Sequence, residues 1–344
     1  MKVLIYGDFD TLQLAASYLR AFQQLGHTVV PFDVRRSQGE LRPWLSNRWA
    51  HRATITSLRL RRWGASAWND SLLSETRRTR PDLALIFNGH FIMPETLRAI
   101  RGSGARLFIL HADNPFRPFL NARPEGLECA VEADCYFIWS RTLENRLAEI
   151  GVRRVEYLPF AWDPEAFPHI GLSAEPVNDV VFVGSWDPER EHWLEPIARH
   201  FNLKIWGPPY WRTRSRSGSC VSIAWQGRAV RGREAAEIMA KSRVVLNILR
   251  RQNMPDGTVM RTFETPGVGA FGLSTRTAGA EQILAEGVAG AYFGTIEECC
   301  SQLQNLLPGE GTRSLLAANA HEIVRRGHTY FDRARQMVDI YDRL

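Results

Sequence analysis

The sequence lacks several features that would assign it to a class at once. It has no uninterrupted hydrophobic run of the roughly 18 residues that a membrane-spanning helix needs. Its five cysteines are odd in number and show no zinc-like pair of pairs, so neither a disulfide framework nor a structural metal is expected. The opening residues 1–10 (MKVLIYGDFD) turn acidic too soon for a signal peptide. A location in the cytoplasm is therefore expected.

Lysine is also scarce, and the basic residues are almost all arginine. The 344-residue chain has 43 Lys and Arg against 37 Asp and Glu, and its only lysines are Lys2, Lys204 and Lys241. A net charge of +6 suits an anionic ligand or an anionic membrane surface. It does not by itself indicate nucleic acid, and the length suggests about two domains.

Short apolar runs alternate with helical patterns in two series. The first series begins with residues 2–6, a helix over 11–25 and a strand over 27–32, followed by strands over 82–87, 106–110 and 134–139. A segment rich in Pro and aromatics, 158–168, follows. The second series places strands over 179–183, 203–206, 222–225, 243–247 and 291–293. We predict two Rossmann-like domains, 1–165 and 166–327, and a terminal helix over 328–344.

Residues 247–275 carry the strongest functional signal. Asn247 ends a predicted strand, and Arg250, Arg261 and Glu264 follow around a glycine-rich turn. Guanidinium groups and helix-start amides can hold phosphate oxygens, and a carboxylate can accept hydrogen bonds from ribose hydroxyls. Earlier in the same half, the turn at Gly184 and Ser185 leads to Arg190, a third candidate for a diphosphate. The pattern predicts a site for a nucleoside diphosphate.

The same residues resemble a known family. Residues 247–250 have the sequence N-I-L-R. The motif R-x-F-E begins at Arg261, and the motif P-x-x-G-A-F begins at Pro266. These words resemble the donor-binding segment of GT-B glycosyltransferases, in particular the bacterial CgeB-like group and the group 1 glycosyl transferases. The resemblance implies an α/β fold of two Rossmann-like domains that face each other across a cleft. It also implies a C-terminal crossover helix that returns to the first domain.

The resemblance also implies roles for single residues. Glu264 matches the second glutamate of the E-x7-E pattern, which binds the donor ribose, whereas Asp256 stands where the first glutamate is usual. Phe263 and Gly267 belong to the same donor-binding segment. The donor would be a nucleotide sugar, no further cofactor is expected, and GT-B enzymes usually need no metal. The D-x-D of Asp8 and Asp10 is a metal-binding motif of GT-A enzymes, and here we therefore interpret either residue as a helix cap or as facing the acceptor.

In the first half, Asp113 follows a predicted strand within the stretch HADNPF, and His90 follows another within NGH. Either could accept a proton from an acceptor hydroxyl. Asp113 could instead form a turn.

Residues 42–80 combine nine arginines with four tryptophans. They could touch an anionic membrane, contact a glycan or lipid-linked acceptor, stack on nucleic-acid bases, or form a plain helical layer. We expect a glycosyltransferase of bacterial surface glycans, cytoplasmic or peripheral at the inner membrane face, with no nucleic-acid partner. A non-catalytic nucleotide-sugar-binding or surface-assembly protein with the same fold is the alternative.

Overall fold

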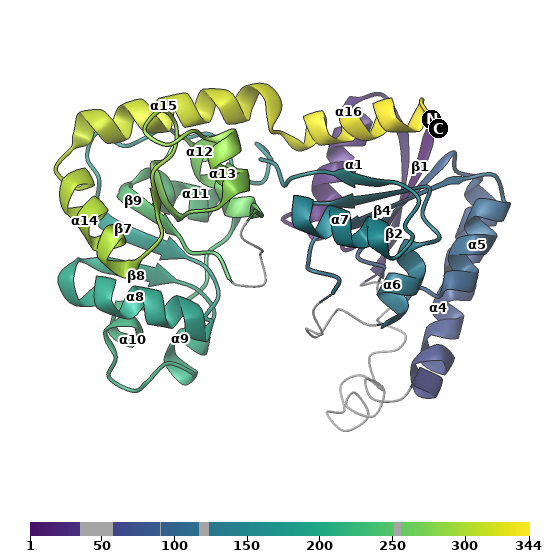
Figure 1. The fold of residues 1–344 in the computed structure, drawn as a ribbon, viewed down its shortest axis with the longest axis horizontal. Helices are drawn as coiled ribbons and strands as arrows, with labels where there is room; N and C mark the ends of the chain where they lie inside the picture. The colour runs from purple at the N-terminus through teal and green to yellow at the C-terminus, as the bar shows by residue number, and fades with distance from the viewer. Residues whose placement is uncertain (35–57, 90, 117–123, 251–255) are drawn as a thin grey trace. The chain divides into compact units, whose positions relative to one another are not determined.

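The computed structural model describes residues 1–34, 58–89, 91–116, 124–250 and 256–344. The chain divides into two compact units (Figure 1). The N-terminal unit comprises Met1–Leu158 and Arg333–Leu344, and the C-terminal unit comprises Pro159–Asp332. The division thus falls after residues 158 and 332, and the sequence-based boundaries lie after 165 and 327. The membership of Arg333–Leu344 in the N-terminal unit agrees with a terminal helix that returns to it.

The N-terminal unit is a six-stranded parallel sheet with strand order β2-β1-β3-β4-β5-β6. Its strands are β1 (Lys2–Gly7), β2 (Thr28–Asp33), β3 (Leu83–Phe87), β4 (Arg106–His111), β5 (Cys135–Ile138) and β6 (Val155–Tyr157). Its helices are α1 (Leu14–Gln24), α4 (Leu58–Thr79), α5 (Pro94–Gly102), α6 (Pro124–Ala130), α7 (Arg141–Glu149) and most of α16 (Tyr330–Tyr341). Every residue of β3 is buried, as expected for a parallel strand covered on both faces.

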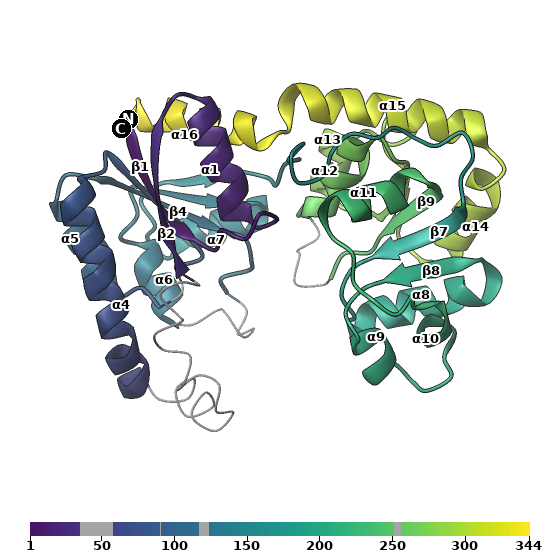
Figure 2. The same cartoon turned by 180° about the vertical axis from the view of Figure 1, so that it is seen from behind.

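The C-terminal unit is a five-stranded parallel sheet with order β11-β10-β9-β7-β8 (Figure 2). Its strands are β7 (Asn178–Val183), β8 (Leu203–Trp206), β9 (Ser242–Asn247), β10 (Gly272–Thr275) and β11 (Tyr292–Phe293). Its helices are α8 (Pro188–His200), α9 (Tyr210–Thr213), α10 (Cys220–Ala224), α11 (Gly232–Ala240), α12 (Met260–Val268), α13 (Ala278–Ile283), α14 (Ile296–Leu306) and α15 (Glu310–Gly327).

One predicted strand is wrong. Residues 222–225 belong largely to helix α10, because the Ser219 side chain accepts a hydrogen bond from the Ser222 amide and caps the helix. Only Trp225 keeps a bridge to β8, through Ile205. A short apolar run does not by itself distinguish a strand from a buried helical turn.

Both sheets have a topological switch point. Chain order reverses next to β1 in the N-terminal unit, where β1 lies between β2 and β3, and next to β7 in the C-terminal unit, where β7 lies between β8 and β9. In open α/β sheets ligands bind outside the carboxyl ends of the strands at such points. The fold therefore indicates two sheet edges as candidate ligand-binding positions, one in each unit.

Candidate functional site

The carboxyl edge of the C-terminal unit brings together most of the predicted donor residues. Gly184 and Ser185 follow β7 directly, and Asp187 caps α8 by accepting a hydrogen bond from the Glu189 amide. Asn247 ends β9, the neighbour of β7. A Cβ on Gly184 would lie 2.9 Å from the Phe182 ring, so only glycine fits at this turn. The turn after β7 and the segment after β9 therefore lie side by side at the switch point.

Two arginines connect these segments. Arg190 donates from Nε to the Ile248 carbonyl at 3.0 Å and from Nη1 to the Ser185 carbonyl at 3.1 Å. Arg250 donates from Nη2 to the Ser185 hydroxyl, and its Nε lies 3.7 Å from the Asp187 carboxylate. These contacts fix both guanidinium groups in position before any ligand arrives.

The edge is strongly electropositive around Arg190. The pKa of Arg190 is lowered to about 10, mainly by burial and also by the charges of Arg250 and Arg261, while the carboxylate of Asp187 opposes this shift. Because a charged guanidinium is disfavoured by burial and by like charges, an anion bound here would relieve both effects. The arrangement is suited to phosphate.

Helix α12 supplies the third arginine and the buried carboxylate. Arg261 Nη1 lies 2.9 Å from Glu264 Oε2, one helical turn away, and Arg261 Nη2 donates to the Val183 carbonyl at 3.4 Å. Glu264 is only 5% exposed. Burial raises its pKa, Arg261 opposes this effect, and Asp163 adds to it. The positive end of the α12 dipole lies in the same turn as Arg261 and also favours an anion.

The remaining predicted residues of this segment are engaged in packing. Phe263 is fully buried and stacks on His328, with 5.6 Å between ring centroids. A Cβ on Gly267 would lie 2.3 Å from the Trp162 ring. The Asn247 amide donates to the Ser274 hydroxyl at 3.1 Å, which ties β9 to β10. These contacts hold α12 and the strand ends in register.

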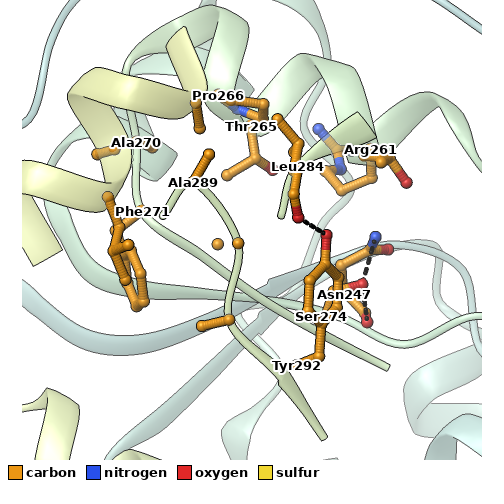
Figure 3. A pocket seen from close by; sticks show the side chains of 17 residues that line it. Asn247, Arg261, Thr265, Pro266, Ala270, Phe271, Ser274, Leu284, Ala289 and Tyr292 are labelled. Carbon is orange, nitrogen blue, oxygen red and sulfur yellow. Dashed lines mark hydrogen bonds between the residues drawn. The ribbon is translucent and has the colours of Figure 1, made fainter. Parts of the chain in front are cut away.

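A cavity of about 40 Å³ lies behind α12, lined by Asn247, Arg261 and the apolar side chains of α12, α15 and the β10–β11 region (Figure 3). Tyr292 closes one side by donating its hydroxyl to the Leu284 carbonyl at 2.7 Å. The space suits one or two waters rather than a nucleotide.

In the N-terminal unit, Asp113 lies just beyond the end of β4, next to a buried histidine. Nδ1 of His111 lies 2.8 Å from the Asp113 carbonyl, which indicates that Nδ1 carries the proton and donates. Burial lowers the pKa of His111 to about 4, and the hydrogen bond to Asp113 only partly opposes this effect. His111 is therefore neutral near pH 7.

The loop after β3 holds the Asp113 segment. Asn88 has a left-handed backbone with φ of 57°, and its Oδ1 accepts a hydrogen bond from the Ala112 amide at 2.7 Å. Phe91 is also left-handed, with φ of 64°. Such conformations cost energy in residues other than glycine and are concentrated at functional sites. The predicted base His90 lies outside the described residues.

Several contacts at both edges were not singled out in the sequence. Asp187 supports Arg250, Asp163 lies close enough to Glu264 to affect its ionisation, and Asn88 supports Ala112. The dipeptide Asp187-Pro188 does predict a helix start, because a capping residue followed by Pro is typical of one. Asp163-Pro164 carries the same signal, and the Asp163 side chain accepts a hydrogen bond from the Glu165 amide at 3.0 Å, whereas Asn88-Gly89 is a dipeptide typical of turns.

The D-x-D motif of Asp8 and Asp10 forms a turn. Asp8 Oδ1 accepts a hydrogen bond from the Asp10 amide at 3.0 Å, and Asp10 precedes α1. Within the described part of the chain, no group of three His, Cys, Asp or Glu side chains is arranged to hold a metal ion.

The basic, tryptophan-containing segment 42–80 is described only in part. Trp68, in α4, is 4% exposed and packs against Tyr6 and Phe32, so it belongs to the core. Arg77 and Arg78 at the end of the same helix are exposed. Trp44 and Trp49 lie outside the described residues, as does the side chain of Trp63. Among the helices that are described, none is long and apolar enough to cross a membrane.

Two α/β units, each built on a parallel sheet, and a terminal helix that belongs to the first unit form the GT-B fold. Residues 190–339 match the model of a family described as glycosyl transferase-like. Among curated proteins, none matches the sequence. The resemblance to GT-B glycosyltransferases is thus confirmed, and the family match and the fold together support a glycosyltransferase.

Solved structures of similar fold cover whole chains. Sucrose-phosphate synthase from Thermosynechococcus elongatus is 10% identical with a TM-score of 0.65, and the match covers 100% of this chain and 98% of that one. The trehalose-6-phosphate synthase OtsA is 12% identical, with a TM-score of 0.66 and coverage of 100% and 99%. HepE from Anabaena, solved with UDP and glucose, is 14% identical, with a TM-score of 0.63 and full coverage of both chains. At such identities the likeness establishes the fold alone.

Proposed function

We propose that this protein transfers a sugar from a nucleoside diphosphate sugar to an acceptor hydroxyl. The observation that carries the proposal is the convergence of Arg190, Arg250 and Arg261 at the switch point of the C-terminal unit, beside the start of α12. A diphosphate is the ligand that this charge distribution favours. HepE, of similar fold, was solved with UDP, which makes UDP the first nucleotide to test.

Each residue has a distinct role in the proposal. Arg261 and the first amides of α12 bind the diphosphate, and Arg190 and Arg250 add charge from the other side. Glu264, held by Arg261, accepts hydrogen bonds from the ribose hydroxyls. As the bond between the anomeric carbon and the diphosphate oxygen breaks, its electron pair leaves with the diphosphate. Fixed cations stabilise the developing charge without having to reorganise.

On the acceptor side, the hydroxyl oxygen forms the new bond to the anomeric carbon, and its proton must go to a base. Asp113 is the candidate, with His90 as the second. His111 is unsuited to this role, because it is buried and its Nδ1 is already bonded to the Asp113 carbonyl. We propose transfer without a tightly bound metal, since three guanidinium groups provide the charge that a metal would otherwise supply.

The acceptor and the cellular role follow from the family resemblance. We propose a glycan or lipid-linked acceptor in bacterial surface glycan synthesis, with the enzyme in the cytoplasm or at the inner membrane face through residues 42–80.

The test is thermal stabilisation by UDP, dTDP, GDP, CMP and ADP, with and without EDTA, for the wild-type protein and for Arg261→Ala and Glu264→Ala. A ligand that binds only the folded state raises the melting temperature by mass action. We expect one diphosphate to stabilise the wild type regardless of EDTA and both variants to lose the shift. The control variant Arg325→Ala, at an exposed residue that pairs with Glu322, should keep the shift. No shift with any nucleotide would refute the donor site, and a shift without any hydrolysis of the matching nucleotide sugar would favour a non-catalytic binding protein.

A further inference from the structure

A second cluster of arginines lies at the opposite edge of the C-terminal sheet. A cavity of about 340 Å³ is found where β9 begins, lined by the 172–176 segment, by Ser242 and Arg243, and by the connection from α14 to α15. Arg313, in the first turns of α15, lies in its wall. The donor residues described above follow the other ends of the same strands, so this cavity is a separate place in the unit.

Arg313 is buried although it is charged. It is 4% exposed, and its Nη1 donates to the carbonyls of Leu306 and Leu307, the latter at 2.7 Å. These bonds fix the guanidinium at the carboxyl end of α14. Its Nε is buried and has no hydrogen-bond partner among the described residues. A buried charged donor without an acceptor is costly, and an anion bound in the cavity would offset the charge of this guanidinium.

A second cation faces the same cavity. Arg243 is half-buried at the start of β9, and its closest carboxylate is that of Asp179, at 3.6 Å. Burial lowers the pKa of Arg313, the charge of Arg243 lowers it further, and Glu310 opposes them. Glu310 is exposed at the start of α15, so its side chain can turn towards solvent. The start of this 18-residue helix adds the positive end of its dipole to the same wall.

We propose that this cavity binds a small phosphate monoester through Arg313 and Arg243. A guanidinium with fixed orientation binds a phosphate through two parallel N–H groups, and a second guanidinium neutralises the remaining charge. The cavity is larger than one phosphate group, which leaves room for a small ester substituent. The site does not depend on the proposed donor site, because the two share no residue.

The experiment is a titration of the wild-type protein with glycerol 3-phosphate, orthophosphate and sulfate at constant ionic strength, followed by thermal shift and by calorimetry. Saturating nucleoside diphosphate is present in a parallel set, to occupy the donor site. We expect saturable binding of glycerol 3-phosphate with and without the nucleotide, tighter than that of sulfate. Equal responses to all three anions would show general charge screening and would overturn the proposal.

Variants separate this cavity from the donor site. Arg243→Gln should weaken binding of glycerol 3-phosphate about tenfold, because one charge-assisted hydrogen bond is lost. Glu310→Gln should tighten binding several-fold, since it removes the opposing carboxylate. Arg325→Gln removes one positive charge from an exposed position of α15 and should leave the affinity for glycerol 3-phosphate unchanged. Arg313→Lys keeps the positive charge but lacks the two parallel N–H groups of a guanidinium. If this variant folds, it should bind glycerol 3-phosphate at least as weakly as Arg243→Gln does.

The outcomes distinguish the two sites. Loss of phosphate binding in Arg261→Ala, with Arg243→Gln unaffected, would place the anion among the donor arginines and overturn the proposal. Loss in Arg243→Gln, with Arg261→Ala unaffected, would support it whether or not nucleotides bind.

Discussion

The carboxyl edges of the two sheets have the same architecture and opposite chemistry. In the C-terminal unit three guanidinium groups meet, and Arg190 and Arg250 are held largely by backbone carbonyls and a serine hydroxyl. In the N-terminal unit the edge carries the carboxylate of Asp113, a neutral histidine and two residues with left-handed backbone. A parallel sheet thus determines where a ligand binds, and the side chains that follow each strand determine which ligand it is.

The difference also concerns rigidity. Arg190 can hold its place only while Ile248 and Ser185 hold theirs, so the donor edge is built in advance. At the other edge, a side-chain hydrogen bond from the Ala112 amide to Asn88 links two loops. We expect variants of the C-terminal edge to change binding and variants of the N-terminal edge to change turnover.

The largest expected effect is that of Asp113→Asn, which keeps the shape and removes the basic carboxylate. If Asp113 is the base, turnover should fall by about 10²-fold or more. The affinity for nucleoside diphosphate should not change, because Asp113 belongs to the other unit. Steady-state kinetics of nucleotide-sugar turnover, together with calorimetry on the diphosphate, give both quantities. Unchanged turnover would show that Asp113 is not the base. His90 would then be the remaining candidate, unless the reaction needs no base.

The next effect is that of Arg261→Ala, which should weaken diphosphate binding by roughly 1.5–3 kcal/mol, or about 10- to 100-fold. It also leaves the buried Glu264 carboxylate without its cation. Adding Glu264→Gln to Arg261→Ala should therefore recover part of the stability while binding stays weak. Chemical denaturation and calorimetry on the two single variants and the double variant test this coupling. Strictly additive losses of stability would contradict it.

A third prediction uses the buried histidine of the N-terminal edge. His111 has a folded-state pKa of about 4, below its value in the unfolded chain. As the pH is lowered from 6.5 to 4, the unfolded state takes up a proton that the folded state does not. The free energy of unfolding therefore decreases as the pH falls through this window. The loss is roughly 1.4 kcal/mol per pH unit.

His111→Asn should remove this part of the pH dependence. Melting temperatures of wild type and variant should converge as pH falls from 7 to 5. Parallel curves over this range would show that His111 is protonated in the folded state or does not titrate at all.

The smallest expected effect concerns Asn88, where two variants separate its two properties. Asn88→Gly relieves the left-handed backbone but removes the acceptor for the Ala112 amide, whereas Asn88→Asp keeps an acceptor there. If the hydrogen bond positions the Asp113 segment, Asn88→Gly should lower turnover several-fold and Asn88→Asp should not. Melting temperatures show whether either variant changes through stability alone. The reverse order of the two variants would assign the role of Asn88 to its backbone.

Much of the fold was predictable because parallel strands are buried on both faces. The segment LALIF at β3 is a continuous apolar run, and the family resemblance supplied the GT-B architecture. The strand predicted over 222–225 failed because its length suits a helical turn as well, and the Ser219 cap decides between them.

The candidate site was predictable where residues cluster in sequence. Arg250, Arg261 and Glu264 lie within one strand–loop–helix unit, so their residue types and spacing, together with the family resemblance, indicated them. The packing of Gly267 on Trp162 and the approach of Asp163 to Glu264 join residues about 100 positions apart. No local pattern encodes such contacts, and they appear only when the chain is folded.

The position of α16 has a consequence for how the protein is made. Its side chains Ala334, Met337 and Ile340 are buried, and most of the helix belongs to the N-terminal unit. Residues 159–332 are continuous in the chain, so the C-terminal unit can fold as soon as it leaves the ribosome. The N-terminal unit is completed only after the whole C-terminal unit has been synthesised, because the apolar surface that receives α16 stays uncovered until residues 333–344 are present.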